Sequence, residues 1–282
     1  MPFDVIDSLS IPGDPAKANE DAFAVEGNAA VVLDGATGLG ENLLPGPSDA
    51  AWIAHFGARR LMAHLKGGDT PDKALRQALA ETEKSFVGLR RRPPKEKYEI
   101  PCASMMLVCA MEAGFEALWF GDCAALVQRP GEPVEIIGEA FDKRAAEARR
   151  AALLSKEKGI APAAGLSRAE FLPHVRAARN KLNTGKTGWL FSPDAHAAEH
   201  AVKKRFAAPA GALLLLATDG FLALASDYGA TDAQGLMEAA ENDGLKALGE
   251  EIRALETEDS DGRRFPRFKK SDDATAVLLK IA

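Results

Sequence analysis

The sequence lacks the features that mark nucleic-acid-binding and membrane proteins. It has no basic excess, because 35 Lys and Arg against 41 Asp and Glu give a formal net charge of -6. That balance leaves no electrostatic footprint for nucleic acid or an anionic membrane surface. No apolar run reaches the roughly 18 to 20 residues of a membrane helix. The first residues, MPFDVIDSLS, lack the basic and apolar regions of a signal peptide. We therefore expect a cytoplasmic protein with neither nucleic acid nor membrane as a partner.

Cysteine is also scarce. Cys102, Cys109 and Cys123 are the only three in 282 residues, which is typical of a reducing compartment and does not make a disulfide framework. We interpret them as small buried hydrophobic residues. Apolar residues, in contrast, are plentiful, since 46% of the chain is hydrophobic and 27% charged. This composition permits a sizeable core.

The hydrophobic pattern predicts strands and helices that follow one another in separate groups. Residues 22–34 are typical of two strands around a turn at Gly27-Asn28, and two amphipathic helices follow, one capped by Ser48 or Asp49 and one starting at Thr70. The pattern then favours a β-meander over 103–138 and a mostly helical segment over 141–183. The remaining predicted elements are a strand at 188–192, a short helix at 194–200, a buried strand at 212–218, helices within 219–257 and a last strand at 274–282. This order favours an α+β fold with helices packed on antiparallel sheets.

Acidic residues stand beside the strands at five places along the chain. Asp34-Gly35 ends one strand, and Asp219-Gly220 ends the most apolar run, LLLLA. Acidic residues at turns are ordinary, because aspartate bonds to nearby backbone groups. Five such places together are less ordinary, because carboxylates at strand ends are expected to converge at one edge of a sheet. The other three places are Asn19-Glu20-Asp21, Gly121-Asp122 and Asp272-Asp273.

Converging carboxylates need a counter-charge, because buried anions must be paired or must bind a metal. A set of oxygen ligands without His or Cys favours Mg²⁺ or Mn²⁺ over Zn²⁺. The glycine after Asp34 and the one after Asp219 allow a close approach of the backbone, so that a carbonyl oxygen is available as a further ligand. The sequence therefore predicts a centre for hard divalent cations.

At these residues the sequence resembles the metal-dependent PP2C-type serine/threonine phosphatases, also called the PPM family, in their bacterial form. The motifs occur in the family order and span nearly the whole chain, although each is weak alone. They are NEDAF (19–23), VLDGATG (32–38), FGDCAALV (120–127), LLATDGFLAL (215–224) and SDDATAVLL (271–279). The resemblance implies a single domain over residues 1–282, built as a four-layer α-β-β-α sandwich of two antiparallel sheets flanked by helix pairs.

The resemblance also implies a role for each acidic residue. Asp34 would bridge two Mn²⁺ or Mg²⁺ ions, with Gly35 offering its carbonyl oxygen to one of them. Asp219 and Asp272 would bind the second ion, and Asp219 and Asp34 are the residues on which catalysis would depend. The further members of the implied set are Glu20 or Asp21, acting mainly through bound water, Asp122 for a third, weaker ion, and Asp273 in a position often occupied by asparagine.

The implied reaction is the hydrolysis of phosphoserine and phosphothreonine monoesters on a phosphorylated protein substrate. Two cations hold a bridging hydroxide in line with the phosphate, so that catalysis depends on positioning and charge neutralisation. The cysteines lack the signature loop of cysteine phosphatases.

Two positions depart from the family pattern. An arginine that holds the substrate phosphate in many relatives is replaced by Ala16, and Lys17 beside it supplies charge without a planar bidentate grip. A histidine that follows Asp-Gly in many eukaryotic members is replaced by Ala36. The alternative is therefore a catalytically weak or inactive module of the same fold that binds a phosphorylated partner.

Three other motifs have a functional and a plain interpretation. HAAEH (196–200) fits the zinc motif of inverted zinc peptidases, although a solvated helix face explains it as well. NTGKTG (183–188) resembles part of a phosphate-binding loop, but no apolar strand precedes it, which favours a turn. The run Arg90–Arg92 is either a solvated surface or a receiver for an acidic substrate.

Overall fold

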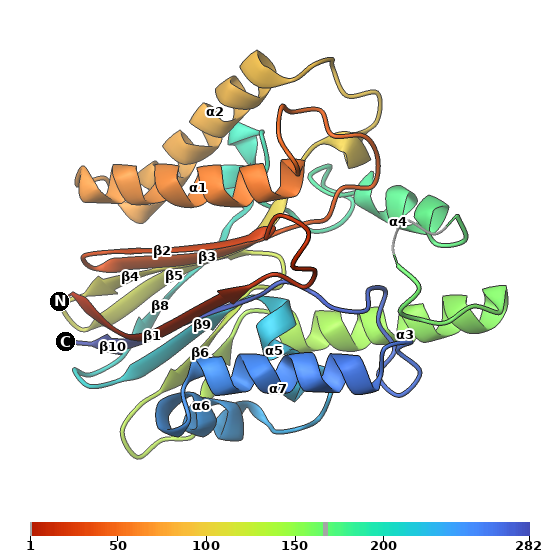
Figure 1. Cartoon of the computed structure of the whole chain (residues 1–282). Helices are drawn as coiled ribbons and strands as arrows, with labels where there is room; N and C mark the ends of the chain where they lie inside the picture. Colours follow the sequence, from red (N-terminus) through yellow and green to blue (C-terminus); the bar gives the residue numbers. More distant parts are fainter. Residues whose placement is uncertain (1, 166–168) are drawn as a thin grey trace.

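The computed structural model describes residues 2–165 and 169–282 (Figure 1). Met1 of the predicted domain and residues 166–168 of the predicted helical segment lie outside the described residues. The described elements form two five-stranded antiparallel sheets. Sheet I has the order β1 (Phe3–Ile11), β10 (Ala274–Ile281), β9 (Leu213–Ala217), β6 (Ala124–Gln128) and β7 (Glu135–Ile137). Sheet II has the order β2 (Asp21–Glu26), β3 (Ala29–Gly35), β4 (Ala103–Met111), β5 (Gly114–Phe120) and β8 (Val202–Ala207).

Helices cover the outer face of each sheet (Figure 1). The helices α1 (Asp49–Lys66) and α2 (Pro71–Leu89) pack on sheet II through an apolar cluster that includes Leu33 and Ile53. The helices α5 (Asp219–Ser226), α6 (Ala233–Asn242) and α7 (Leu245–Glu258) pack on sheet I. A third cluster, with Val32 and Leu216, fills the space between the sheets. The predicted α-β-β-α sandwich is confirmed.

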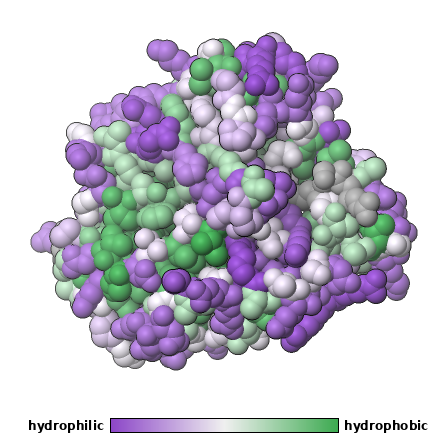
Figure 2. All heavy atoms as spheres, in the orientation of Figure 1, coloured by the Kyte–Doolittle hydropathy of each residue, from purple (hydrophilic) through white to green (hydrophobic). Residues whose placement is uncertain are grey.

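Two further helices lie at one end of the sandwich. The helix α3 (Ala140–Lys158) extends from the side of α5, and α4 (Leu172–Arg179) lies near the short 3₁₀ helix η1 (Lys97–Glu99). Figure 2 shows that mostly hydrophilic side chains cover the outside of α3, whereas hydrophobic atoms appear on the face where β1 lies. There Val5 and Ile6 are about half exposed.

Local signals in the sequence explain most element boundaries. The Ser48 hydroxyl accepts a hydrogen bond from the backbone N–H of Ala51 at 3.2 Å and caps α1. Pro71 occupies the first turn of α2, where its missing N–H costs nothing. Gly27 turns the β2–β3 hairpin with a φ of +59°. The predicted short helix at 194–200 is the 3₁₀ helix η2 (Ala195–His200).

The predicted β-meander is wrong in its pairing. The strands β4 and β5 do form a hairpin, but the chain then crosses at Gly121-Asp122 to sheet I, where β6 pairs with β7 and β9. Both sheets present buried apolar strands, so hydrophobic pattern alone does not tell which sheet a strand joins. The predicted strand at 188–192 is also wrong, because Phe191 alone makes an isolated bridge, to Ala103.

Two strands, β1 and β8, were not predicted from the sequence. They are edge strands, β1 of sheet I and β8 of sheet II. None of the helices within residues 2–165 and 169–282 combines the length and hydrophobicity needed to cross a lipid bilayer. The three cysteines are buried and free, as predicted.

Candidate metal centre

Carboxylates from three separate parts of the chain meet at one end of the sandwich. Asp34 lies at the end of β3, Asp122 follows β5, and Asp219 begins α5 directly after β9. One carboxylate oxygen of each lies within 4.8 Å of the others. Among the residues that the structure describes, no other three His, Cys, Asp or Glu side chains come together in this way. The predicted convergence of distant acids is therefore present for these three.

Glycines make this close assembly possible. A Cβ on Gly35 would meet the backbone oxygens of Ala50 and Glu20, the latter at 2.6 Å. A Cβ on Gly220 would overlap the backbone oxygen of Asp273. Since backbone atoms cannot move aside as a flexible side chain does, only glycine fits at either position. The glycine after each aspartate thus brings the strand ends together.

The electrostatics of the cluster are unfavourable without a cation. Burial, together with the negative charges of Asp219, Asp21, Asp272 and Asp122, raises the pKa of Asp34 well above its usual range. Burial raises the pKa of Asp219 to about 7, with Arg144 opposing the shift and Asp272 adding to it. The protein therefore concentrates more negative charge here than its own groups neutralise.

A hard divalent cation fits this donor set. The Oδ1 atom of Asp219 is buried and has no hydrogen-bond partner among the described residues. A buried polar atom without a partner is costly unless something else binds it. The Oδ2 atom of Asp219 accepts a hydrogen bond from Arg144 at 3.0 Å. All three clustered side chains offer oxygen, which Mg²⁺ and Mn²⁺ prefer. The residues present are suited to such an ion.

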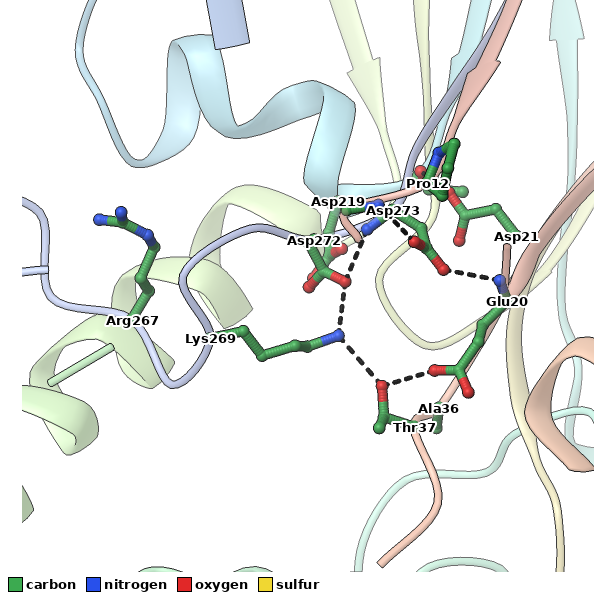
Figure 3. A network of polar contacts seen from close by, with 12 residues as sticks. Pro12, Glu20, Asp21, Ala36, Thr37, Asp219, Arg267, Lys269, Asp272 and Asp273 are labelled. Carbon is green, nitrogen blue, oxygen red and sulfur yellow. Dashed lines mark hydrogen bonds and ion pairs between the residues drawn. The ribbon is translucent and has the colours of Figure 1, made fainter. Parts of the chain in front are cut away.

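Asp272 lies beside this cluster and is paired with a cation of the chain itself (Figure 3). The Lys269 ammonium donates to Asp272 at 2.5 Å and to the Thr37 hydroxyl at 3.2 Å. Burial opposes ionisation of Asp272, but the charge and hydrogen bond of Lys269 lower the pKa of Asp272 below its usual range. Lys269 therefore already supplies one positive charge to this part of the site.

The other predicted ligands, Glu20, Asp21 and Asp273, accept hydrogen bonds from backbone N–H groups and hydroxyls of neighbouring segments (Figure 3). Asp273 accepts the backbone N–H groups of Gly13 at 2.7 Å and Glu20 at 2.6 Å. Both carboxylate oxygens of Glu20 accept hydroxyl hydrogen bonds, from Thr37 and Ser48. Asp21 is buried and accepts from Thr218 at 2.8 Å. The two bonds of Asp273 align residues 13–20 with the start of β10.

The cluster forms one side of a cavity of about 470 Å³, a size usual for small-ligand sites. Five acidic residues line it. We call four of them, Asp34, Asp122, Asp219 and Asp272, the acidic floor, and the fifth, Glu147, lies on α3. The cations that line the same cavity are called the basic wall. They are Lys143, Arg150, Arg179 and Lys269. Apolar side chains, among them Trp189, Leu190 and Phe268, line the space between.

Side-chain contacts attach the helices of the basic wall to the acidic floor. Arg144, which is buried in α3, bridges Asp219 and Asp227. Lys143 donates to the backbone oxygen of Gly121 at 2.8 Å, and Arg179 lies 3.3 Å from the backbone oxygens of Ala36 and Thr37. Because these contacts reach the segments that carry the acids, α3 and α4 are positioned relative to the floor.

The basic wall was not predicted from the sequence. Lys17, the predicted phosphate-binding residue, has a side chain that is 77% exposed and pairs with Asp14 at 3.5 Å. It is not among the residues lining the cavity, whereas Ala36 is. A signal for the wall does exist, because Lys143 and Arg150 fall on one helix face, although Glu147 lies between them on the same face. The surrounding segment is so rich in charge that this spacing does not stand out.

Other singled-out motifs lie away from the acidic floor. The NTGKTG segment forms turns, with Asn183 at a φ of +53°. Arg92 pairs with Glu99 at 2.8 Å. The histidines of HAAEH are exposed on η2, and among the described residues no third ligand-type side chain joins them. The peptidase interpretation therefore has no three-residue zinc site to support it.

Comparison with known proteins places the fold. No family model matches the chain, and no curated protein matches its sequence. Solved structures do match over almost the whole chain. The PPM Ser-Thr phosphatase MsPP from Mycobacterium smegmatis, in complex with cacodylate, is 18% identical with a TM-score of 0.57, and the match covers 99% of each chain.

Two more structures agree. The photosystem II phosphatase PBCP is 15% identical with a TM-score of 0.59 over 99% of each chain. The catalytic domain of the serine/threonine phosphatase PstP, in complex with two manganese ions, is 15% identical with a TM-score of 0.55 over 99% of this chain and 98% of that one. The protein therefore has the fold of the bacterial-type PPM serine/threonine phosphatases.

Proposed function

We propose that this protein is a metal-dependent phosphatase that hydrolyses phosphoserine and phosphothreonine monoesters on proteins. The proposal rests on the meeting of Asp34, Asp122 and Asp219 in the lining of a cavity that four cationic side chains also line. Manganese bound to the fold-mate PstP supports the choice of metal. We propose one catalytic domain over residues 1–282, acting on phosphoproteins in the cytoplasm, where free buried cysteines are usual.

The acidic floor would hold the metal ions. Asp34 and Asp219 would bind two Mn²⁺ or Mg²⁺ ions, together with Asp272 and the Gly35 carbonyl oxygen, and Asp122 would serve a possible third. Bound divalent cations supply charge neutralisation and water activation for attack on a phosphate ester. Glu20, Asp21 and Asp273 would act indirectly, because their hydrogen bonds fix the strand ends that carry the ligands.

The basic wall would receive the substrate phosphate. A phosphate monoester carries up to two negative charges near pH 7, and arginine offers it a planar pair of donors. Arg150 and Arg179 line the cavity, and Lys143 and Lys269 add two ammonium groups. These cations compensate for the arginine that is absent at Ala16. Lys17 is too exposed to be the main phosphate-binding residue, and we assign it at most a role in long-range attraction.

A phosphatase assay with matched variants tests this function. Turnover of p-nitrophenyl phosphate and of a phosphothreonine peptide is measured with Mn²⁺ and then with EDTA. We expect metal-dependent turnover that Asp219→Asn abolishes and Asp243→Asn preserves, because Asp243 is exposed at the end of α6, away from the cavity. Calorimetric titration with Mn²⁺ separates the outcomes. Metal binding without turnover by the wild-type protein would contradict the enzymatic proposal and favour a phosphoprotein-binding module.

A further inference from the structure

Two histidines of the 3₁₀ helix η2 face each other in a geometry that suits one metal ion. The Nε2 atoms of His196 and His200 lie 3.3 Å apart. Two imidazole nitrogens bound to the same Zn²⁺ at about 2.0–2.1 Å with a near-tetrahedral angle are separated by roughly 3.3–3.4 Å. Both histidines are exposed, so water can occupy the remaining coordination positions. The spacing alone would also suit a hydrogen bond between the rings.

Neighbouring side chains orient both rings. The Glu199 carboxylate lies 3.2 Å from Nδ1 of His196, which leaves Nε2 of that ring turned toward His200. A carboxylate on the second ring nitrogen is the usual partner of a metal-bound histidine. The indole ring of Trp189 stacks on His200, with the ring centroids 3.7 Å apart and the planes 8° from parallel. The pair is therefore pre-oriented rather than a chance meeting of two mobile side chains.

The backbone under the pair is fixed as well. Asp194 caps η2 by accepting the backbone N–H of His196 at 3.0 Å. Ala197, which lies between the two histidines in sequence, is fully buried. The Arg76 guanidinium of α2 lies 3.6 Å from the Glu199 carboxylate. This ion pair helps to keep the carboxylate near Nδ1 of His196. Because η2 is capped by Asp194 at its start and Ala197 is buried at its centre, the backbone holds both imidazole rings close to each other.

We propose that His196 and His200 form a second, separate metal site that binds Zn²⁺ or Cu²⁺, with Glu199 as the carboxylate that orients His196. Imidazole nitrogen selects Zn²⁺ and Cu²⁺, whereas the oxygen-only acidic floor selects Mg²⁺ and Mn²⁺. The two sites therefore differ in the metals they take. This inference does not depend on the proposed phosphatase function.

The site has a structural link to the main cavity through Trp189. The indole that stacks on His200 also lines the cavity, next to Leu190. Binding of an ion would fix His200 and with it the position of the indole. A metal on η2 would thus stiffen one part of the cavity lining without touching the acidic floor.

Calorimetry with Zn²⁺ tests the site directly. The titration is made in excess Mg²⁺, so that the acidic floor is filled with the ion it prefers. We expect one equivalent of Zn²⁺ to bind to the wild-type protein and to His55→Ala, and this equivalent to be lost in His196→Ala and in His200→Ala. His55 is an exposed histidine on α1 outside the pair. Glu199→Gln is expected to weaken binding by about 10- to 100-fold.

Copper provides a readout that reports the ligands themselves. Bound Cu²⁺ should show nitrogen hyperfine coupling in its electron paramagnetic resonance spectrum and should quench tryptophan fluorescence, and Trp189→Phe should remove most of that quenching. Circular dichroism shows whether each variant is folded. Absence of Zn²⁺ binding to the wild-type protein, or binding unchanged in both histidine variants, would overturn the proposal and leave a hydrogen bond between the rings.

Discussion

The acidic floor and the basic wall of the cavity are built in different ways. The residues of the floor lie next to the ends of strands from both sheets, and one of them, Asp122, lies in the turn after β5. Gly35 and Gly220 allow close backbone contacts there, because a side chain at either position would overlap backbone oxygens. The wall comes mainly from α3 and α4, which lie outside the sandwich and reach the floor through the side chains of Arg144, Lys143 and Arg179 (Figure 1). The proposed metal centre is thus part of the core of the sandwich, whereas the proposed substrate contacts are on an attached segment.

This difference separates two kinds of substitution. Changes in the floor should affect the chemistry and the stability of the sandwich together, because the same atoms serve both. Changes in the wall should affect substrate binding with little effect on the core. Substitutions in the floor, in the wall and in the residues that support the wall test this contrast.

The largest effect is expected from Asp34→Asn in the floor. Loss of a metal-binding carboxylate should lower kcat/KM by on the order of 10³-fold, which is about 4 kcal/mol at 1.36 kcal/mol per tenfold change. The same variant should unfold at a higher temperature in EDTA. Burial and neighbouring acids raise the pKa of Asp34. A carboxyl whose pKa is raised on folding destabilises the protein once the pH exceeds the pKa of that carboxyl in the unfolded chain.

The control for Asp34→Asn is Asp4→Asn, on an exposed position of β1. It should change neither kcat/KM nor the metal-free melting temperature appreciably. Steady-state kinetics with Mn²⁺ and thermal unfolding in EDTA provide the two measurements. A metal-free melting temperature that falls in Asp34→Asn would show that the carboxylate cluster is not repulsive.

The second prediction concerns the glycine of the floor. Gly35→Ala should lower the free energy of unfolding by about 1–3 kcal/mol, because the added Cβ overlaps the backbone oxygens of Ala50 and Glu20. Gly88→Ala is the matched control, since Gly88 lies in α2 with nothing within 4 Å of an added Cβ. That change should be neutral or stabilise by up to about 1 kcal/mol. Urea unfolding of both variants checks the contrast, and equal effects would contradict it.

The third prediction concerns the wall. Arg150→Ala should raise KM for a phosphothreonine peptide by about 10-fold and leave kcat nearly unchanged, because it removes ground-state binding of the phosphate. Arg149→Ala on the same helix is the control, because Arg149 is exposed and does not line the cavity, whereas Arg150 does. Steady-state kinetics at two salt concentrations separate a local contact from general attraction. A fall in kcat with unchanged KM would assign Arg150 to the chemical step instead.

The smallest effect is expected at η1, whose residues contact α4 and the residue after it. Glu99 of η1 accepts two hydrogen bonds from Arg92, at 3.0 and 2.8 Å. The neighbouring Tyr98 bonds to Asn180 after α4 and lies against Arg176. The Arg92 hydrogen bonds lower the pKa of Glu99 from 4.5 to about 2. This contribution to stability is complete above pH 4.5 and is lost as the pH falls toward 2.

Glu99→Gln should therefore lower the free energy of unfolding by about 1 kcal/mol at pH 7, and the difference from the wild-type protein should shrink at pH 3. The control is Glu112→Gln, an exposed position in the β4–β5 turn. Urea titrations at the two pH values give the comparison. A difference that does not change between pH 7 and pH 3 would show that the Glu99 charge is not the cause.

The floor was predictable from the sequence, and the wall was not. An aspartate that follows a buried apolar run indicates the end of a strand. The order of these motifs along the chain predicted the sandwich, which is confirmed. The cations of α3 and α4 carry no comparable signal, because Lys143, Arg150 and Arg179 are a few charges in a segment full of them. The sequence also did not distinguish the acids that line the cavity from those that bond to the backbone. Asp273 and Asp272 are neighbours, yet Asp273 bonds to backbone N–H groups while Asp272 lines the cavity.

The two missed strands have a common physical reason. The strands β1 and β8 are sheet edges, and their exposed residues are largely polar or charged, as in VKKRFA of β8. Lysines on an edge strand discourage pairing with another chain, but they also remove the apolar run by which a strand is recognised. The sheet switch between β5 and β6 was missed because both strands are buried and apolar.

Anomalous diffraction from crystals grown with Mn²⁺ shows directly whether Asp34, Asp122 and Asp219 gather around hard divalent cations. The account predicts an anomalous peak within bonding distance of Asp34 and Asp219 oxygens, and loss of that peak in Asp219→Asn. A fully ordered cluster with no peak between these carboxylates at saturating Mn²⁺ would contradict it.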